Sequence, residues 1–251
     1  MNRYPNNEMS LGDIFNRSVR LHYLTLKHTI LCIFFITIVK YISMILIQSV
    51  STQYQYLIYV IAATAIVYFF SAALFATHRA FIDESQSIRV TLKTIWHRAI
   101  QIYTTFAAYI IGIILVDYLS KLLVLGIDKI FHQAITSNGV TLIVTTILVM
   151  VYIATFYFAF PITVIDEKPA HKAFYISALL TEKTKFAVLI SFMILSAVIL
   201  LLTPGMINEY LLSTYHLDAL FDFVVLCVAV PLYINLLLFI IHDAKQQVVL
   251  E

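Results

Sequence analysis

The chain is poor in charge, glycine and proline. Only 12% of its 251 residues are charged and 61% are hydrophobic, whereas an ordinary soluble domain has about 25% charged and about 45–50% apolar residues. A soluble globule of this length cannot bury so large an apolar fraction. Five glycines and five prolines exclude collagen-like and disordered chains, which need far more of both. We therefore expect an integral membrane protein.

The chain also has only two cysteines, and its basic residues barely outnumber its acidic residues. Cys32 and Cys227 both fall inside apolar stretches, so we expect neither a disulfide framework nor a cysteine zinc site, and we interpret both as small buried hydrophobic residues. The net charge is only +2 and no run of five basic residues occurs, which excludes an extended nucleic-acid surface. The expected partners are membrane lipids with anionic headgroups and other membrane proteins, not nucleic acid.

Apolar stretches of membrane-spanning length recur along the chain. A bilayer core about 30 Å thick needs about 20 helical residues. Six stretches meet this length and predict transmembrane helices near residues 29–50, 54–77, 100–121, 140–165, 186–202 and 219–241. The sequence thus predicts an all-α polytopic protein in which residues 1–251 form one integral membrane domain and residues 1–28 a cytoplasmic amphipathic segment. The first apolar run is too long for a signal-peptide core, so we expect the N-terminus to be retained.

The basic residues predict the orientation, because cytoplasmic loops carry the excess of Lys and Arg. Of the 16 basic residues, Lys121 and Lys129 fall on one side and Lys40 lies within the first span. All the others fall on the opposite side: Arg3, Arg17, Arg20, Lys27, Arg79, Arg89, Lys93, Arg98, Lys168, Lys172, Lys183, Lys185 and Lys245. We therefore expect both termini in the cytoplasm and Gly139 on the outer side.

Three cytoplasmic segments have the periodicity of amphipathic helices. Their apolar stripes are Leu11, Phe15, Val19, Tyr23 and Leu26 in residues 10–27; Ile88, Leu92, Ile95, Trp96 and Ala99 in residues 85–99; and Ala170, Ala173, Phe174, Ser177 and Leu180 in residues 168–180. Ser10 and Asp13 form a capping-box-like start to the first, and Pro169 suits the first turn of the third. Each segment precedes two spans, which indicates a threefold helix–span–span repeat or, alternatively, three unrelated interfacial connections.

An amphipathic helix with a basic polar face lies in the membrane interface and attracts anionic lipid. The candidate headgroup contacts are Arg17, Arg20, Arg89, Lys93 and Arg98. The alternative is a structural collar, in which each helix packs its apolar stripe against the cytoplasmic ends of the spans.

Polar residues inside the spans are the candidates for a functional site. Lys40 falls near the middle of the first span, where a charge costs about 2.5–3.5 kcal/mol. Asp117 and Asp222, near the outer ends of the third and sixth spans, are candidate partners, and a cluster of the three would resemble a proton or substrate relay. The alternative is that Lys40 snorkels to the outer interface.

Prolines interrupt two of the predicted spans. Pro231 and Asn235 predict a kink in the sixth span, and Pro161 predicts a bend near the cytoplasmic end of the fourth. Kinked helices line cavities in transporters, but proline also occurs in membrane helices without such a role. Lys40 and the kinked sixth span together define an alternative function, a small transporter or channel.

Motifs for catalysis are missing from the sequence. No nucleophile elbow, Walker loop, HExxH or paired intramembrane aspartate motif occurs, and the five glycines are too few for a phosphate-cradling loop. The eight histidines lack metal-ligand spacing such as H-x-x-x-H. We expect no enzyme activity, no metal and no cofactor.

One stretch carries a family resemblance, the string FPITVIDEKPAHKAFYISALLT at residues 160–181. It resembles the YciC-like family of bacterial inner-membrane proteins, and residues 10–21 and 231–243 are similar to the ends of that family. The chain lacks the Pro-Gly pair that often opens the fourth span there. Related membrane domains occur attached to glycerophosphodiester phosphodiesterases, which implies a phospholipid context. The resemblance implies a fold and an inner-membrane location but no activity and no catalytic residues. We expect a non-enzymatic protein with a role in envelope maintenance or in interactions with lipids and membrane proteins.

Overall fold

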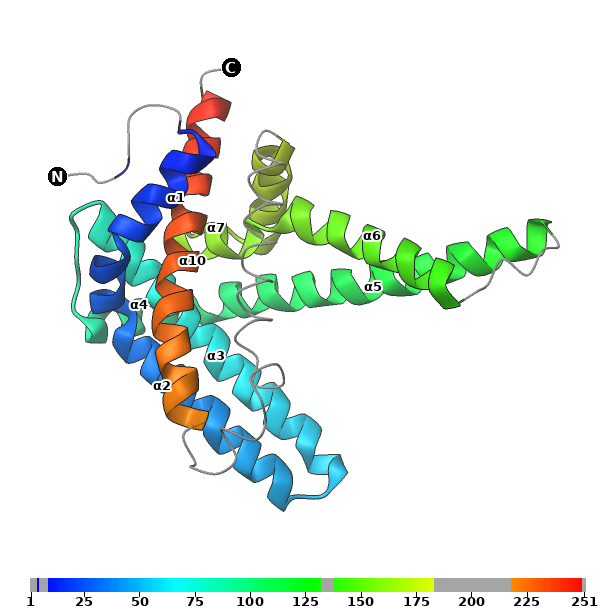
Figure 1. Ribbon diagram of the computed structural model, residues 1–251, viewed down its shortest axis with the longest axis horizontal. Coiled ribbons are helices and arrows are strands. Elements are labelled where there is room, and N and C mark those ends of the chain that lie inside the picture. The colour runs from blue at the N-terminus through cyan, green and yellow to red at the C-terminus, as the bar shows by residue number, and fades with distance from the viewer. Residues whose placement is uncertain (1–3, 5–8, 132–137, 183–217, 250–251) are drawn as a thin grey trace. The chain divides into compact units, whose positions relative to one another are not determined.

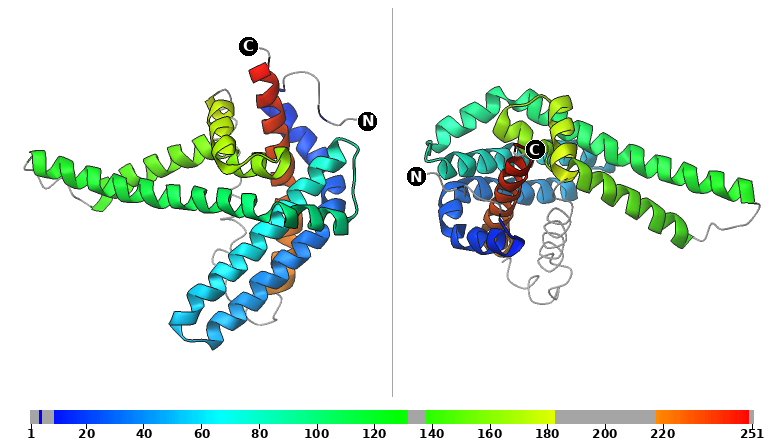
Figure 2. Two further views of the ribbon diagram at one scale, coloured as in Figure 1. Left: turned by 180° about the vertical axis from the view of Figure 1, so that it is seen from behind. Right: turned by 90° about the horizontal axis from the view of Figure 1, so that it is seen from above.

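The computed structural model describes residues 4, 9–131, 138–182 and 218–249, and every regular element among them is an α-helix (Figures 1 and 2). Within these residues, five helices are long and apolar enough to cross a bilayer: His22–Ser49, Thr52–Phe81, Ala99–Gly126, Ile143–Asp166 and Phe223–Gln246. They match five of the six predicted spans and confirm the all-α prediction. The other predicted span, residues 186–202, lies outside the described residues.

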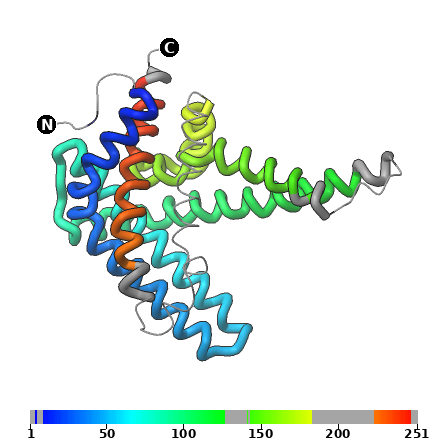
Figure 3. Tube along the Cα trace, viewed as in Figure 1, coloured from blue at the N-terminus to red at the C-terminus, as the bar shows by residue number. Residues whose placement is uncertain are grey.

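The chain divides into two compact units, residues 1–99 with 186–251 and residues 100–185. The described helices of the first unit are α1 (Leu11–Arg20), α2 (His22–Ser49), α3 (Thr52–Phe81), α4 (Ile88–His97) and α10 (Asp218–Val249). The long helices α2 and α3 form a hairpin, and α10 packs along both of them. The short helices lie on this bundle, α1 against α10 and α4 against α3. The tube in Figure 3 traces α1 beside the last turns of α10.

The start of α1 follows the predicted capping pattern. Ser10 is the N-cap: its Oγ accepts a hydrogen bond from the Asp13 backbone N–H (3.2 Å) and donates one to Asp13 Oδ2 (2.6 Å). The helix ends sooner than the periodicity predicts, because Leu21 forms a turn and α2 begins at His22. The prediction of one amphipathic helix over residues 10–27 is therefore wrong, and the stripe residues Tyr23 and Leu26 belong to α2.

The C-terminus of α3 is closed by a left-handed residue. Asp83 has φ 61°, and this conformation lets the Glu84 N–H donate to the Arg79 carbonyl (2.8 Å) and the Asp83 N–H point at the Ala80 carbonyl (3.4 Å). This is the Schellman pattern, which satisfies carbonyls left free at a helix end. It also folds Glu84 back beside Arg79.

The described helices of the second unit are α5 (Ala99–Phe131), α6 (Asn138–Phe156), α7 (Ala159–Asp166) and a further helix at residues 170–182. Two hydroxyl pairs join α5 to the returning arm, Ser120 to Thr145 (2.7 Å) and Thr105 to Thr163 (3.0 Å). The two arms are therefore antiparallel. Turn residues 157 and 158 separate α6 from α7, at the place where Pro161 cannot donate to the carbonyl four residues earlier. The predicted bend at Pro161 is confirmed as an interruption of the helix.

Large apolar side chains remain exposed along the long helices, among them Ile45 (55%), Val60 (62%), Ile114 (60%) and Ile147 (56%). Soluble proteins rarely expose contiguous apolar patches larger than a few hundred Å². Helices of this length with such surfaces indicate a membrane protein in which these side chains face lipid.

Candidate functional site

Asn235, a predicted intramembrane polar residue, lies at a fully buried junction of three helices. Its Oδ1 accepts a hydrogen bond from Thr25 Oγ1 on α2 (2.5 Å), and its Nδ2 donates to the Ser18 backbone carbonyl on α1 (2.9 Å). The exposed fraction of each of the three residues is 0%. The carbonyl can only accept, so it fixes which end of the amide faces α1.

The break at Leu21 explains why the Ser18 backbone carbonyl has no hydrogen-bond donor within α1. The last four carbonyls of a helix have no partner within it, and Ser18 stands two residues before the last residue of α1. Asn235 supplies the donor for this carbonyl, while the Ser18 hydroxyl donates to the Ile14 carbonyl (2.7 Å). The side chain of Asn235 thus caps α1 and holds it on α10 and α2.

The surroundings of Asn235 are apolar. Ile234, Leu237, Leu238 and Phe239 are each at most 2% exposed. Pro231 is also buried, and α10 continues through it as one helix from Asp218 to Val249. Pro231 and Asn235 therefore belong to a packed interface, with the polar groups of Asn235 occupied by α1 and α2.

Lys40 lies half-buried on α2, nine residues before its end, which corresponds to about 14 Å along the helix axis. An apolar pocket of about 220 Å³ lies nearby between α2 and α3, with Val39, Ser43 and Leu46 in its wall. Lys40 is not among the residues that line it. The lining of the pocket is almost wholly apolar, so it offers no polar path for an ion.

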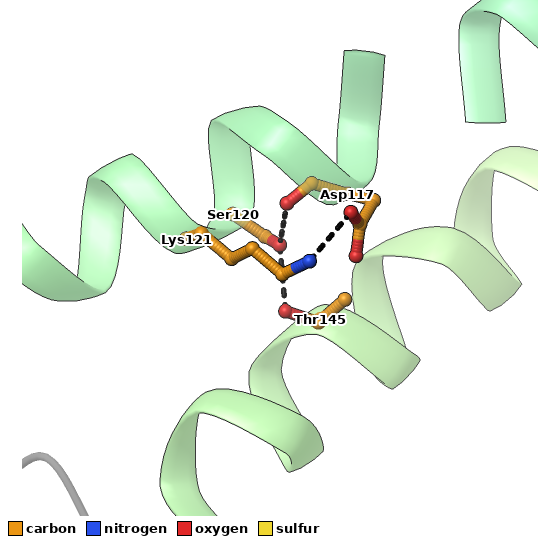
Figure 4. Close-up of polar contacts among 4 residues, drawn as sticks. All are labelled: Asp117, Ser120, Lys121 and Thr145. Atoms are coloured by element: carbon orange, nitrogen blue, oxygen red, sulfur yellow. Dashed lines mark hydrogen bonds and ion pairs between the residues drawn. The ribbon is translucent and has the colours of Figure 1, made fainter. Parts of the chain in front are cut away.

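Asp117 pairs within its own helix. Its Oδ2 accepts from Lys121 Nζ at 2.7 Å, one turn further along α5, beside the Ser120–Thr145 contact that joins α5 to α6 (Figure 4). Lys40 and Asp117 belong to different units, and the side chain of Asp222 lies outside the described residues. The three-residue relay therefore stays a prediction, and Asp117 has a neutralising partner that the sequence reasoning did not assign.

The predicted lipid-contacting cations lie at the ends and faces of the two short helices. Arg17 and Arg20 are exposed in the last turn of α1, where a positive charge also stabilises the negative end of the helix dipole. Arg89 and Lys93 are exposed on α4, and Arg98, its C-cap residue, is half-buried.

The apolar stripes of the three predicted interfacial helices differ in how far the structure buries them. Helix α1 buries Ile14 and Ser18, while its stripe residues Leu11, Phe15 and Val19 are 39%, 45% and 49% exposed. Helix α4 buries Thr91 and Ile95 but leaves Trp96 69% exposed. The helix at residues 170–182 instead buries its stripe, with Ala173, Ser177 and Leu180 at most 3% exposed. A collar arrangement therefore describes the last helix and not α1.

Ser177 binds the helix interruption near Pro161. Its Oγ accepts from the Phe158 N–H and donates to the Thr155 carbonyl, both at 3.1 Å. Thr181 Oγ1 donates to the same carbonyl at 3.0 Å. The sequence stripe included Ser177 only as a small residue, whereas its hydroxyl satisfies the backbone where α6 ends.

Two arginines share one buried aromatic ring, an arrangement that the sequence reasoning missed. The guanidinium carbons of Arg79 and Arg98 lie 5.1 Å and 4.9 Å from the centre of the Phe75 ring, which is 1% exposed. Arg79 also forms an ion pair with Glu84 through Nη1. The spacing of Phe75 and Arg79, four residues apart on α3, could have indicated their contact, but Arg98 arrives through tertiary structure.

Tyr4 attaches the N-terminal segment to the ends of α3 and α10. Its hydroxyl lies 2.9 Å from His78 Nδ1, and its ring stacks on His242 at 4.4 Å and meets the edges of Phe81 and Phe239. No local sequence signal marked this residue.

Neither a disulfide between Cys32 and Cys227 nor a metal site is seen in the described residues. Cys32 is buried and Cys227 is half-buried, and both are free thiols. Where side chains are described, no group of three or more His, Cys, Asp or Glu is placed to hold a metal ion.

Comparison with known proteins adds no functional assignment. No protein-family model, no curated protein and no solved structure matches the chain.

Proposed function

We propose that the chain is a non-enzymatic, multi-pass protein of the bacterial inner membrane that contributes to envelope maintenance by binding anionic lipid headgroups and other membrane proteins. The observation that carries the proposal is the exposed apolar stripe of α1, Leu11, Phe15 and Val19, beside the exposed Arg17 and Arg20. A helix with these two faces is stable where apolar side chains meet the acyl boundary and cations meet phosphates. The YciC-like resemblance supports the bacterial setting.

Helix α4 supports the same role. Its exposed Trp96 is a residue type enriched at membrane–water interfaces, and the exposed Arg89 and Lys93 lie on the same short helix. Each basic side chain near an anionic surface contributes about 1 kcal/mol to membrane attraction. Together α1 and α4 would present one basic, amphipathic surface to the cytoplasmic leaflet.

The topology in the proposal has six spans, with both termini in the cytoplasm. The Met9 backbone N–H donates to Asp243 Oδ1 (2.8 Å), and Tyr4 stacks on His242, so Tyr4 and Met9 lie against the end of α10. Ends on the same side require an even number of crossings. The predicted span at residues 186–202, outside the described residues, would supply the sixth. The described order α1–α2–α3 followed by α4–α5–α6/α7 fits two copies of the proposed repeat.

The transporter or channel alternative has less support. Its predicted sixth span, α10, continues through Pro231 as one helix and contributes Asn235, whose amide is occupied by Thr25 and Ser18. The alternative then depends on Lys40, and Lys40→Met tests it directly. Unchanged expression and unchanged membrane phenotype in this variant would count against transport.

Lipid dependence tests the proposed function. The protein would be reconstituted in phosphatidylcholine vesicles with increasing phosphatidylglycerol, and its thermal stability would be measured at each composition. We expect anionic lipid to stabilise the wild type, and we expect a variant with Arg17, Arg20, Arg89 and Lys93 all replaced by Gln to lose most of that gain. Lys121→Gln, on the predicted outer side, is the control. Equal anionic-lipid dependence of the quadruple variant and the wild type would refute the proposal.

Topology is tested separately. Reporters fused after Gly139 and after the C-terminus would be assayed for cytoplasmic or outer location. We expect the first outside and the second inside, and a cytoplasmic reporter at Gly139 would overturn the orientation.

A further inference from the structure

We propose that Arg79, Arg98 and Phe75 form a binding site for one phosphate group, and that the phosphate of a lipid headgroup fills it. This site is called the arginine pair below. The proposal deepens the lipid-binding role and rests on it for the source of the phosphate, but not for the binding chemistry.

The geometry of the arginine pair brings two positive charges close together. Each guanidinium carbon lies about 5 Å from the same ring centre, so the two carbons are no more than about 10 Å apart. This upper limit is comparable to the Debye length of about 8 Å at physiological salt, and charges that are partly buried are screened less than exposed ones, so the two charges repel one another. Contact with the face of the buried Phe75 ring offsets part of the repulsion, and a bound anion would offset more.

Arg79 has hydrogen-bonding capacity to spare. A guanidinium group has five N–H donors, and Glu84 accepts at Nη1. Among the described residues, Arg79 Nε is buried without a hydrogen-bond partner. A buried donor left unpaired is unfavourable, and an anion with several acceptor oxygens would satisfy it once the side chains that cover Nε move aside.

Phosphate suits this arrangement better than a carboxylate. A guanidinium group stacked on a ring has its plane fixed and directs its N–H groups outward along its edge, in the fork geometry that matches phosphate oxygens. The oxygens of a phosphate project in several directions, so one phosphate can accept from both arginines. Glu84, 58% exposed at its side chain, is held near Arg79 by the Schellman turn and would compete with the incoming anion.

The position of the arginine pair along α3 favours a lipid source. Helix α3 has 30 residues and is about 45 Å long, so about 15 Å of it extends beyond a 30 Å apolar core. Phe75 and Arg79 lie in its last two turns. Trp96, whose ring meets the edge of Tyr68 at 6.2 Å, precedes Arg98 by two residues and is an interfacial residue type. These positions fit the headgroup layer.

Trp96 makes the site measurable, because it is the single tryptophan of the chain. The full-length protein in detergent would be titrated with phosphatidic acid, phosphatidylglycerol, phosphatidylcholine and inorganic phosphate while Trp96 fluorescence is recorded. We expect saturable changes with the two anionic lipids. Arg79→Gln and Arg98→Gln should each weaken binding about tenfold or more, as the loss of a charge-assisted hydrogen bond requires.

Three further variants separate the site from general surface charge. Lys172→Gln removes an exposed cation from the helix at residues 170–182, outside the proposed headgroup contacts, and should change affinity by less than about twofold, since an isolated surface charge contributes little. Glu84→Gln removes the competitor and should tighten binding. Arg79→Lys keeps the charge but loses the planar fork, so it should bind more weakly than the wild type while retaining its fold by circular dichroism.

The outcomes distinguish this proposal from the proposed function. Equal weakening by Arg79→Gln, Arg98→Gln and Lys172→Gln would overturn the arginine pair and leave general headgroup binding in place. Saturation by inorganic phosphate, with no further effect of anionic lipid, would overturn the lipid assignment. A wild type without a saturable response to any phosphate compound would overturn the site itself, while the vesicle measurement on the quadruple variant would still decide the broader role.

Discussion

The side-chain amide of Asn235 on α10 donates to the backbone carbonyl of Ser18 on α1 over 2.9 Å, across 217 positions of sequence. A side chain in the long helix α10 therefore satisfies a backbone group at the end of the short helix α1, which packs against it. The same amide accepts from Thr25 at the start of α2. One residue thus fixes where α1 stops, where α2 begins and how both contact α10.

Replacement of Asn235 by Leu should destabilise the protein by about 1–3 kcal/mol, because the Ser18 carbonyl and the Thr25 hydroxyl lose a buried partner. Thermal unfolding in detergent measures the change. Thr25→Val removes only one of the two hydrogen bonds of Asn235, so it should lower the free energy of unfolding by less than the Leu substitution does. The double variant should show a coupling energy, and additive effects of the two substitutions would contradict a shared hydrogen bond.

The junction illustrates what the sequence could and could not predict. Hydropathy placed α2, α3, α5, α6 and α10 correctly, because membrane spans need long uninterrupted apolar runs. Asn235 stood out as an unusual polar residue, but the sequence left open whether it lines a cavity or packs in the bundle. The partner, the Ser18 carbonyl, is a backbone group, and no side-chain pattern reports which carbonyl a tertiary fold leaves free. The unpredicted turn at Leu21 has the same origin, since no Gly or Pro marks it.

The interfacial helices show a related limit on what sequence periodicity can predict. Periodicity identifies an apolar stripe but not what covers it, so the stripes of α1 and of residues 168–180 looked alike. The structure buries Ala173 and Ser177 but leaves Phe15 and Val19 exposed. Small residues in the later stripe allow close backbone approach, as at membrane helix interfaces, whereas the stripe of α1 carries larger side chains. Residue size within a stripe therefore carries information that its period does not.

Gly112 should be intolerant of substitution. A Cβ at this position of α5 would lie 1.8 Å from the hydroxyl oxygen and 2.3 Å from Cζ of Tyr152 on α6, so the whole ring would have to move. Gly112→Ala should lower the melting temperature although alanine favours helix. Gly126→Ala on the same helix meets no atom within 4 Å and should be neutral or stabilising by up to about 1 kcal/mol. If Gly112→Ala is still destabilising in a Tyr152→Ala background, the clash is not its cause.

The start of α1 should be sensitive to acid. The hydrogen bond from the Ser10 hydroxyl, aided by the Ser10 backbone contact and by Arg17, holds the pKa of Asp13 below its ordinary value of 3.8. A carboxyl group with a lowered pKa stabilises the folded helix above the ordinary pKa, and this contribution is lost as the pH falls through the lowered value.

The protection of α1 amides against hydrogen exchange, taken relative to the intrinsic exchange rate at each pH, should therefore fall below about pH 4 in the wild type, where carboxyl groups take up protons. Ser10→Ala should move the transition upward toward the ordinary value, and Asp13→Asn should abolish it. Protection of the α1 amides whose pH profile is the same in Asp13→Asn and the wild type would contradict the assignment to Asp13.

Ser177 should stabilise the interruption between α6 and α7. Ser177→Ala leaves the buried Phe158 N–H without its acceptor, which costs about 1–3 kcal/mol, whereas Thr181→Val should cost less because Ser177 still donates to the Thr155 carbonyl. Pro161→Ala restores a backbone donor and lets the helix close across residues 157 and 158, so Ser177→Ala should be milder in that background. Unfolding measurements on the two single variants and the double variant decide this. A penalty for Ser177→Ala that is independent of residue 161 would show that the hydroxyl acts through packing and not by completing the backbone hydrogen bonds that proline prevents.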